Sequence, residues 1–304
     1  RQQGGKEMLE SKGYRVHTLF TISEVCSILK EENHLSDDEV TRIDDFLKGN
    51  VVKFEEKKRP TYEQKLENAE HSVAKKLLEI SIEKKSNLIA SADVITTQEL
   101  LDFAEKVGPH IVALKTHIDI ITDFDPDKTI LPLKDLATKY NFLLMEDRKF
   151  ADIGNTQELQ FSYGIYKISN WADFVTSHVI GGYDSLDCFL NVGVVAILGM
   201  SSKGTLTDKN YQEEALKVAQ SHPNVIGGVS QKQLPEELLL FTPGVSLSDS
   251  ADGKGQQYNT PEHVFRNLQT DFMIVGRGIY KADDAEKAAL NYKIAGWNAY
   301  LESL

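Results

Sequence analysis

Residues 142–156 read FLLMEDRKFADIGNT, an apolar run that passes directly into a cluster of charges and a Gly-Asn pair. The apolar run has the length and composition of a buried strand, and the segment that follows, NTQELQFSYGIYKI, has the spacing of a helix. A strand followed by a helix is the repeating unit of proteins built on a parallel sheet. The stretch therefore predicts an α/β fold in which Asp147 and Lys149 stand where a buried strand ends.

The same strand-helix unit repeats from Asn87 to the end of the chain. The other apolar runs are NLIASADV, HIVALKTHID, DFVTSHVI, GVVAILGMS, NVIGGVS, LLLFTPGV and DFMIVGRGI. In the helical segment TTQELLDFAEKVG, Thr96 and Glu99 form a capping-box pattern. Eight strand candidates over about 218 residues match the usual size of a (β/α)8 barrel. An open doubly wound sheet uses the same near-continuous apolar strands and is the alternative.

The first 50 residues have a different pattern and are predicted to form a short helical and αβ extension. GGKEMLESKG, TISEVCSILKEENH and LSDDEVTRIDDFLKGN are typical of helices, and YRVHTLF is typical of a strand. The charged stretch VVKFEEKKRPTYEQK indicates a linker. We therefore divide the chain into an extension (1–50), a linker (51–70) and a barrel (71–304).

Composition excludes several classes of partner. A net charge of -12 argues against a nucleic-acid or anionic-membrane surface, and no apolar run is long enough to span a membrane. Cys26 and Cys188 lie far apart and match neither a disulfide framework nor a metal knuckle, which favours a reducing compartment. We expect a cytoplasmic protein without nucleic-acid or membrane partners. Because the chain begins with Arg1 and not with methionine, we interpret it as a fragment.

Polar residues follow three successive apolar runs in pairs with a spacing of two. The pairs are Ser91 with Asp93, Lys115 with His117, and Asp147 with Lys149. On a strand this spacing directs both side chains to the same face, and the active sites of barrels lie at the carboxyl ends of the strands. Strand ends are often polar simply because they are exposed to solvent, but a pattern repeated on three strands indicates a functional site.

Lys115 and Lys149 raise the alternative of a Schiff-base lysine of the aldolase type, which needs a depressed pKa. Asp93, Asp147 and Asp152 would instead raise the pKa of these lysines if the groups converge. The pattern therefore favours an electrostatic clamp or a proton donor over a neutral nucleophile.

A metal site built from Asp and His of several strand ends is a second alternative. The interleaved lysines argue against it, because fixed ammonium groups occupy the carboxylates that a cation would need. We predict no metal.

Residues 274–279, IVGRGI, end the last apolar run with the pattern of a phosphate-binding turn. Glycines allow backbone N–H groups to approach a phosphate, Arg277 supplies a forked donor, and barrels often bind phosphate after strands seven and eight. In the preceding polar loop, Gln256 and Tyr258 are candidates to close over a ligand. Surface turns and loops of similar composition are nevertheless common.

Together these motifs resemble orotidine 5'-monophosphate decarboxylase of the eukaryotic type. The resemblance runs from about Asn87 to the C-terminus and is carried by DRKFADIGNT, by SADV and LKTHID before it, and by MSS, TPGV, GQQYN and IVGRGI after it. The first residues, RQQGGKEMLESKGYRVHTLFTISEVCSIL, look like the last part of an orotate phosphoribosyltransferase domain. The two resemblances imply a piece of a fused multifunctional enzyme of the UMP synthase type, with glycosyltransferase activity expected only in the full-length protein.

The resemblance implies a lyase that converts orotidine 5'-monophosphate to UMP, the last step of de novo pyrimidine synthesis, without a cofactor. Lys149 would protonate C6 of the pyrimidine within a charge network with Asp147 and Lys115. Asp152 and Thr156 would reach the partner's site across a homodimer. The other implied substrate contacts are Ser91 and Ser201 to the pyrimidine, Pro243 in the base pocket, Asp93 and Lys115 to the ribose, and Gln256, Tyr258, Gly276 and Arg277 to the phosphate.

Two other interpretations compete with this one. A barrel that only binds a nucleotide would not need the alternation of Lys and Asp. A phosphosugar lyase or aldolase on the same barrel would form an imine with its substrate.

Overall fold

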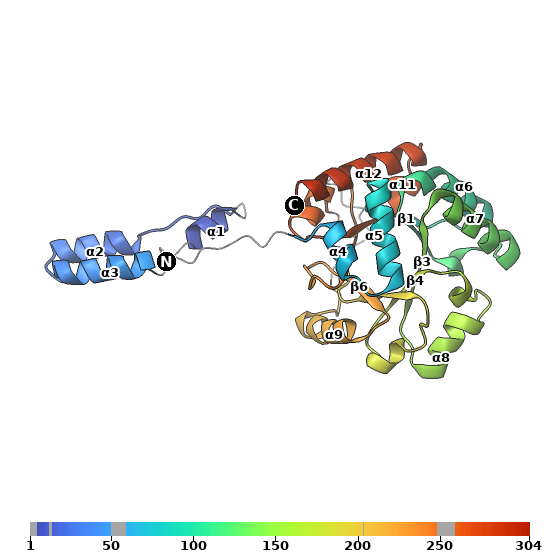
Figure 1. Cartoon of the computed structure of the whole chain (residues 1–304), viewed down its shortest axis with the longest axis horizontal. Coiled ribbons are helices and arrows are strands. Elements are labelled where there is room, and N and C mark those ends of the chain that lie inside the picture. Colours follow the sequence, from blue (N-terminus) through green and yellow to red (C-terminus); the bar gives the residue numbers. More distant parts are fainter. Residues whose placement is uncertain (1–4, 12–13, 50–58, 203, 248–258) are drawn as a thin grey trace. The chain divides into compact units, whose positions relative to one another are not determined.

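The chain forms two compact units, Arg1–Lys58 and Arg59–Leu304 (Figure 1). The computed structural model describes residues 5–11, 14–49, 59–202, 204–247 and 259–304.

The second unit is a closed barrel of parallel strands in the order β1 to β8, with β8 pairing back to β1. The strands are β1 (Leu88–Ala92), β2 (Ala113–Thr116), β3 (Leu143–Phe150), β4 (Phe174–Ser177), β5 (Gly193–Ile197), β6 (Val225–Val229), β7 (Leu239–Pro243) and β8 (Phe272–Val275). Each predicted apolar run contributes one strand. The (β/α)8 barrel is confirmed, and the open doubly wound sheet is excluded.

Helices lie around the barrel, and α5 crosses its amino end (Figure 1). They are α4 (Tyr62–Asn68), α5 (Ser72–Lys84), α6 (Thr97–Val107), α7 (Leu131–Tyr140), α8 (Gly154–Glu158), α9 (Lys209–Ser221), α10 (Pro261–Arg266), α11 (Arg277–Tyr280) and α12 (Ala285–Leu301). The predicted capping box is present at α6, where Thr96 accepts from the N–H of Glu99 and the Glu99 side chain accepts from the N–H of Thr96. Because helices pack outside the barrel and side chains fill its interior, β1 and β5 are buried along their whole length.

Two connections contain less regular helix than the sequence pattern suggests. The segment NTQELQFSYGIYKI forms the short α8 and then a π-helical turn, Leu159–Tyr163. The segment SLDCFLNV contributes only to a 3-10 turn, Tyr183–Leu186.

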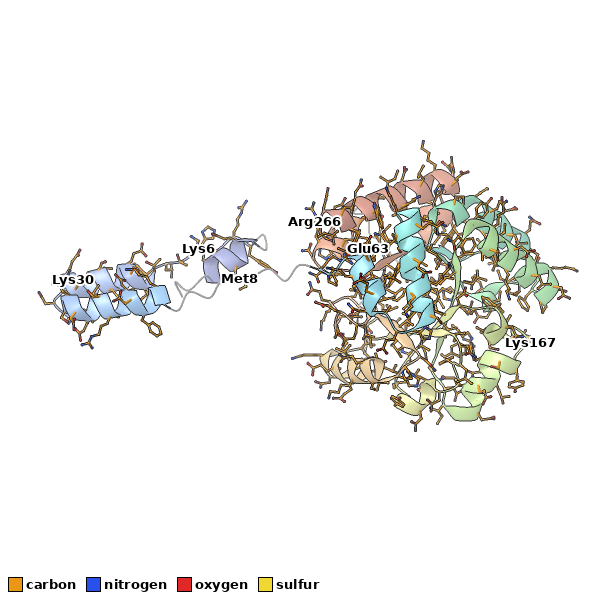
Figure 2. All side chains as sticks on the ribbon, in the orientation of Figure 1. Lys6, Met8, Lys30, Glu63, Lys167 and Arg266 are labelled. Carbon is orange, nitrogen blue, oxygen red and sulfur yellow. The ribbon has the colours of Figure 1, made fainter. Side chains whose placement is uncertain are left out.

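The first unit contains the helices α1 (Gly5–Ser11), α2 (Ile22–Glu31) and α3 (Asp37–Gly49). A capping box of Thr21 with Glu24 begins α2, and Lys30 near its end pairs with Asp37 at the start of α3. Figure 2 labels Lys30 in this unit. The strand predicted at YRVHTLF does not form, because the described part of this unit offers no second strand with which it can pair.

The predicted linker, residues 51–70, ends in a helix. Residues 50–58 lie outside the described part of the chain, but Thr61 and Gln64 form a capping box that begins α4. Tyr62 is buried against Tyr300 of α12, with ring centroids 4.2 Å apart. The second half of the predicted linker therefore belongs to the barrel unit.

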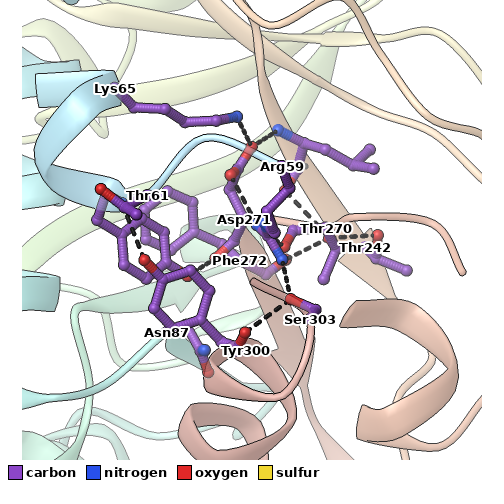
Figure 3. A network of polar contacts seen from close by, with 12 residues as sticks. Arg59, Thr61, Lys65, Asn87, Thr242, Thr270, Asp271, Phe272, Tyr300 and Ser303 are labelled. Atoms are coloured by element: carbon purple, nitrogen blue, oxygen red, sulfur yellow. Dashed lines mark hydrogen bonds and ion pairs between the residues drawn. The ribbon is translucent and has the colours of Figure 1, made fainter. Parts of the chain in front are cut away.

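A buried ionic network lies at the amino end of the barrel, beside β7 and β8 (Figure 3). The carboxylate of Asp271, just before β8, accepts from Arg59 at 3.1 Å, from Lys65 at 2.8 Å and from the N–H of Leu240 at 2.8 Å. Arg59 also donates to the carbonyl of Thr270 at 2.7 Å. The side chains of Arg59 and Asp271 are each 1% exposed. The network joins the segment before α4 to the amino ends of β7 and β8, which is the end of a barrel that serves stability.

We predict that Asp271→Asn lowers the free energy of unfolding by about 3–5 kcal/mol, because it leaves two cations in the protein interior without their carboxylate. Chemical denaturation at neutral pH measures the change. The matched control is Glu214→Gln, which breaks an exposed pair with Lys217 on α9 and is expected to cost less than about 1 kcal/mol. Equal losses for the two variants would contradict a stabilising role of the network.

Candidate active site

A cavity of about 270 Å³ opens at the carboxyl ends of the strands, at the opposite end of the barrel from Asp271. Its lining includes predicted site residues from six strands or the loops after them. These are Ser91, Asp93, Lys115, Asp147, Lys149, Ser201, Pro243, Gly276 and Arg277. Apolar side chains, among them Met145, Ile197, Met200 and Ile274, complete the wall. The cavity therefore combines a charged side with a surface suited to a flat, weakly polar ring.

The carboxylate of Asp147 joins two lysines. Its Oδ1 lies 2.8 Å from the Nζ of Lys149, and its Oδ2 lies 2.9 Å from the Nζ of Lys115. The hydroxyl of Thr176 also donates to Oδ1, at 2.8 Å. Burial would raise the pKa of Asp147, but the nearby ammonium groups of Lys115 and Lys149 outweigh it and hold the pKa well below its usual range. Asp147 is therefore a carboxylate at any working pH.

Lys115 is enclosed by its acceptors. Its Nζ lies 2.8 Å from the Nε2 of His117 and 3.8 Å from the Oδ1 of Asp93, in addition to its contact with Asp147. Burial and the neighbouring Lys115 lower the pKa of His117, so the ring is neutral and its Nε2 accepts from the lysine. Asp93 in turn accepts from the hydroxyl of Ser91 at 2.6 Å. The three predicted strand-end pairs therefore belong to one network. They are Ser91 with Asp93, Lys115 with His117, and Asp147 with Lys149.

Lys149 has an unusual backbone. Its φ is 51°, in the left-handed region that residues with a side chain rarely adopt. The pairing of β3 with β4 shifts register between Glu146 and Phe150, which brackets this residue. Asp147 and Lys149 do converge as their spacing predicts, but an irregularity in the strand brings them together, and not a regular pleat.

The glycines of the IVGRGI turn have different roles. Gly276 lies against Ser91 and Asp93, where a Cβ atom would make ordinary contacts at 3.5 Å or more. A Cβ at Gly278 would lie 2.2 Å from the hydroxyl oxygen of Tyr292, so only glycine fits there. Between them, Arg277 begins the short α11 at the cavity.

Two predicted site residues in the described part of the chain, Asp152 and Thr156, do not join this cluster. The carboxylate of Asp152 accepts from the N–H of Ile153 at 2.9 Å and from Gln160 at 3.3 Å, and Thr156 is exposed on α8. Neither lines the cavity of its own chain. Gln256 and Tyr258 lie outside the described residues.

Within the described residues, no group of three or more His, Cys, Asp or Glu side chains is arranged to hold a metal ion. Among the helices of the same residues, none is both long and apolar enough to cross a membrane.

Comparison with known proteins relates this barrel to one family. Residues 86–292 match the model of the family described as orotidine 5'-phosphate decarboxylase / HUMPS. The chain belongs to this family.

Individual members of the family are similar over most of the chain. An orotidine 5'-phosphate decarboxylase of Saccharomycopsis fibuligera is 42% identical over 80% of this chain and 98% of its own length. A uridine 5'-monophosphate synthase of Bos taurus is 37% identical over all of this chain and 68% of its own length. The crystal structure of orotidine 5'-phosphate decarboxylase from Pyrococcus horikoshii OT3 shares the fold, with a TM-score of 0.54 and 21% identity over 70% of this chain and 99% of that one.

Thr176, which bonds to both Asp147 and Lys149 in this decarboxylase-family barrel, is not among the predicted site residues. The only local signal for it is that a threonine stands in the apolar run DFVTSHVI, two residues before His178. The apolar wall of Met145, Ile197 and Ile274 is also absent from the predicted set. These residues lie inside their strands, whereas the predicted set comes mainly from the polar residues that follow the apolar runs.

Glu146, the neighbour of Asp147, faces away from the cavity and is fully buried. Its carboxyl group accepts from the hydroxyl of Thr116 at 2.6 Å and from the N–H of Ile118 at 3.1 Å. Burial raises the pKa of Glu146 to about 8, although both hydrogen bonds oppose the shift. Glu146 is therefore mainly protonated at neutral pH and supports the end of β2, on which Lys115 lies.

We predict a pH-dependent stability that Glu146→Gln removes. The folded pKa of Glu146, about 8, lies above the unfolded value of about 4.3, so the folded state keeps a proton that the unfolded state releases. This contribution is fully present below about pH 4 and is lost as the pH rises to about 8.

Thermal denaturation of the wild type and of Glu146→Gln at pH 5, 7 and 8.5 tests the predicted direction of this pH dependence. The melting temperature of the variant should rise relative to the wild type as the pH increases, whereas the control Glu214→Gln should follow the wild type. If the melting temperature of Glu146→Gln changed with pH in the same way as that of the wild type, Glu146 would have the same pKa in the folded and unfolded states.

Proposed function

We propose that this chain decarboxylates orotidine 5'-monophosphate to UMP without a cofactor. The observation that carries the proposal is the Lys149–Asp147–Lys115 array at the wall of a cavity that also contains Arg277. Membership of the orotidine 5'-phosphate decarboxylase / HUMPS family supports it.

Loss of CO2 from C6 of the pyrimidine leaves an electron pair on a ring carbon that cannot readily delocalise it. A fixed ammonium group next to this carbon stabilises the developing charge and then supplies the proton that replaces the carboxylate. The side chain of Lys149 is 33% exposed, whereas that of Lys115 is 7% exposed and already has two close acceptors. Lys149 is therefore the proton donor, and Lys115 holds Asp147 in place.

The array is organised before substrate arrives. Asp147 keeps both ammonium groups within 2.9 Å of its oxygens, so the charges need little reorganisation as the carbanion forms. Asp147 also presents negative charge near the departing carboxylate, which favours its loss as neutral CO2.

Binding groups lie around this array. Arg277 and Gly276 would hold the phosphate together with Gln256 and Tyr258, and the apolar wall with Pro243 would hold the pyrimidine beside Ser91 and Ser201. Asp93 and Lys115 would bind the ribose hydroxyls. Binding energy from the distant phosphate then helps to hold C6 against Lys149.

We also propose that the active unit is a homodimer in which Asp152 and Thr156 complete the partner's site. Asp152 is held away from the lysines of its own barrel, next to the exposed Ile153. Ile153 is 62% exposed and Ile180 is 71% exposed, and the two segments are adjacent, since a Cβ at Gly181 would lie 2.8 Å from Ile153. An apolar surface beside Asp152 suits a second copy that brings this carboxylate to the opposite cavity.

The full-length protein is proposed to be bifunctional. The bovine relative named uridine 5'-monophosphate synthase aligns with the whole chain, including the helices α1 to α3. We interpret residues 1–50 as the carboxyl-terminal part of an orotate phosphoribosyltransferase domain. Transferase activity is therefore expected only in the full-length protein.

We also propose that the protein acts in the cytoplasm and has no nucleic-acid or membrane partner. Cys26 and Cys188 are both free thiols, which fits a reducing compartment such as the cytoplasm. The net charge of -12 disfavours nucleic acid and anionic membranes as partners.

Lys149→Ala is expected to lower turnover of orotidine 5'-monophosphate by about 10⁴-fold or more, since it removes both the electrostatic stabilisation and the proton donor. A spectrophotometric assay on the purified chain measures it, and the exposed Lys217→Ala is the control. Near-normal turnover by Lys149→Ala would exclude it as the proton donor. A substrate imine trapped by borohydride would favour the aldolase alternative.

Mixing two inactive variants tests the shared site. Lys149→Ala and Asp152→Ala subunits that exchange at random form hybrid dimers with one intact site each, so about a quarter of the wild-type activity should return. Native mass spectrometry confirms that hybrids are present. Hybrids without activity would show that Asp152 does not serve the partner's site.

A further inference from the structure

Thr176 is a buried threonine of β4 that faces the irregular part of β3. The two strands pair at Glu146 with Val175 and again at Phe150 with Ser177. Three residues of β3 therefore lie opposite one residue of β4, where a regular ladder would place one opposite one. Thr176 is that single residue, and it is 1% exposed.

The hydroxyl of Thr176 replaces a ladder contact at this break. In a regular parallel sheet, each backbone N–H donates to a carbonyl of one of the two neighbouring strands. At the break, the N–H of Lys149 donates to the Oγ1 of Thr176 at 3.0 Å. The same hydroxyl donates to the Oδ1 of Asp147 at 2.8 Å. One oxygen therefore fixes the backbone of Lys149 and the carboxylate of Asp147 relative to each other.

These bonds form a closed circuit with the ammonium group. The Oδ1 of Asp147 that accepts from Thr176 also lies 2.8 Å from the Nζ of Lys149. Lys149 keeps its φ of 51° within this circuit, and such a conformation persists only where several contacts determine it. Thr176 is absent from the lining of the cavity, so it acts on the site through Asp147 and Lys149.

We propose that Thr176 is a positioning residue whose hydroxyl sets the direction in which the Lys149 ammonium enters the cavity. The proposal rests on the decarboxylase function proposed above. Without the hydroxyl, Asp147 can rotate and the backbone of Lys149 loses its acceptor, so the proton donor moves away from C6. Arg277 and Asp93, proposed to bind phosphate and ribose, line the cavity, whereas Thr176 does not, so substrate binding should change little.

Two substitutions separate the hydroxyl from the shape of the side chain. Thr176→Val keeps the shape and removes the hydroxyl, and it should lower kcat about 10- to 100-fold with KM changed less than about 3-fold, because a misplaced catalytic group mainly slows chemistry. Thr176→Ser keeps the hydroxyl and should retain kcat within about 3-fold of the wild type. Thr176→Ala is measured alongside, in case the valine variant does not fold.

Thr270→Val is the matched control, because Thr270 is equally buried and bonds to Thr242 and to the carbonyl of Leu240 at the amino end of the barrel. It should lower the melting temperature without lowering kcat. A loss of kcat in Thr270→Val as large as in Thr176→Val, or unchanged kcat in Thr176→Val and Thr176→Ala, would overturn the proposal.

Amide hydrogen exchange supplies a readout that needs no turnover. The Lys149 N–H should exchange at least about 10-fold faster in Thr176→Val than in the wild type, while Thr176→Ser keeps its protection. If the wild type did not decarboxylate orotidine 5'-monophosphate, the proposed function would fail, and this exchange would still decide whether Thr176 holds Lys149. Unchanged exchange in the valine variant would refute the positioning role.

Discussion

The candidate site depends on one interruption in the hydrogen-bond ladder between β3 and β4. On a regular strand, Asp147 and Lys149 would stand parallel on one face, roughly 7 Å apart. The break instead turns Lys149 into the left-handed region and brings its ammonium to 2.8 Å from Asp147. That backbone conformation costs about 1–2 kcal/mol, while a hydrogen bond to a charged group contributes about 1.5–3 kcal/mol. The strained backbone and the ion pair therefore sustain each other.

The two ends of the barrel use the same motif, a carboxylate between two cations, for different purposes. At the amino end, Asp271 and Arg59 are shielded from water, and their donors include backbone groups of adjacent strands, so the motif stabilises the fold. At the carboxyl end, Asp147 is nearly as enclosed, but a third of the Lys149 side chain remains exposed. An ammonium group held firmly and yet open to a cavity can act on a ligand, which a fully enclosed one cannot do.

Local pattern was sufficient to predict the eight strands and the polar residues at their ends, because each strand-helix unit is encoded within about 30 residues. The strand predicted over residues 14–20 does not form, since local pattern cannot show whether a pairing strand exists. Thr176 is missed for a related reason: its contacts depend on the register of β4 against β3, which residues distant in the chain determine together. The role of Asp152 in the partner's site stays a prediction, because its proposed counterparts, Lys115 and Lys149, belong to another copy of the chain.

Two adjacent acids begin the polar end of β3. The alternation of side chains along the strand places them in different environments and gives them different chemistry. Glu146 and Asp147 differ by one position, so they point to opposite faces of the strand. Glu146 meets only neutral donors in the layer outside the barrel, and burial keeps it protonated with a pKa of about 8. Asp147 meets Lys115 and Lys149 in the cavity and stays ionised. A shift of one residue in register would exchange these environments, leaving a charge buried without a partner and two lysines without their carboxylate. The register of β3 is therefore constrained as strongly by these two acids as by the apolar residues before them.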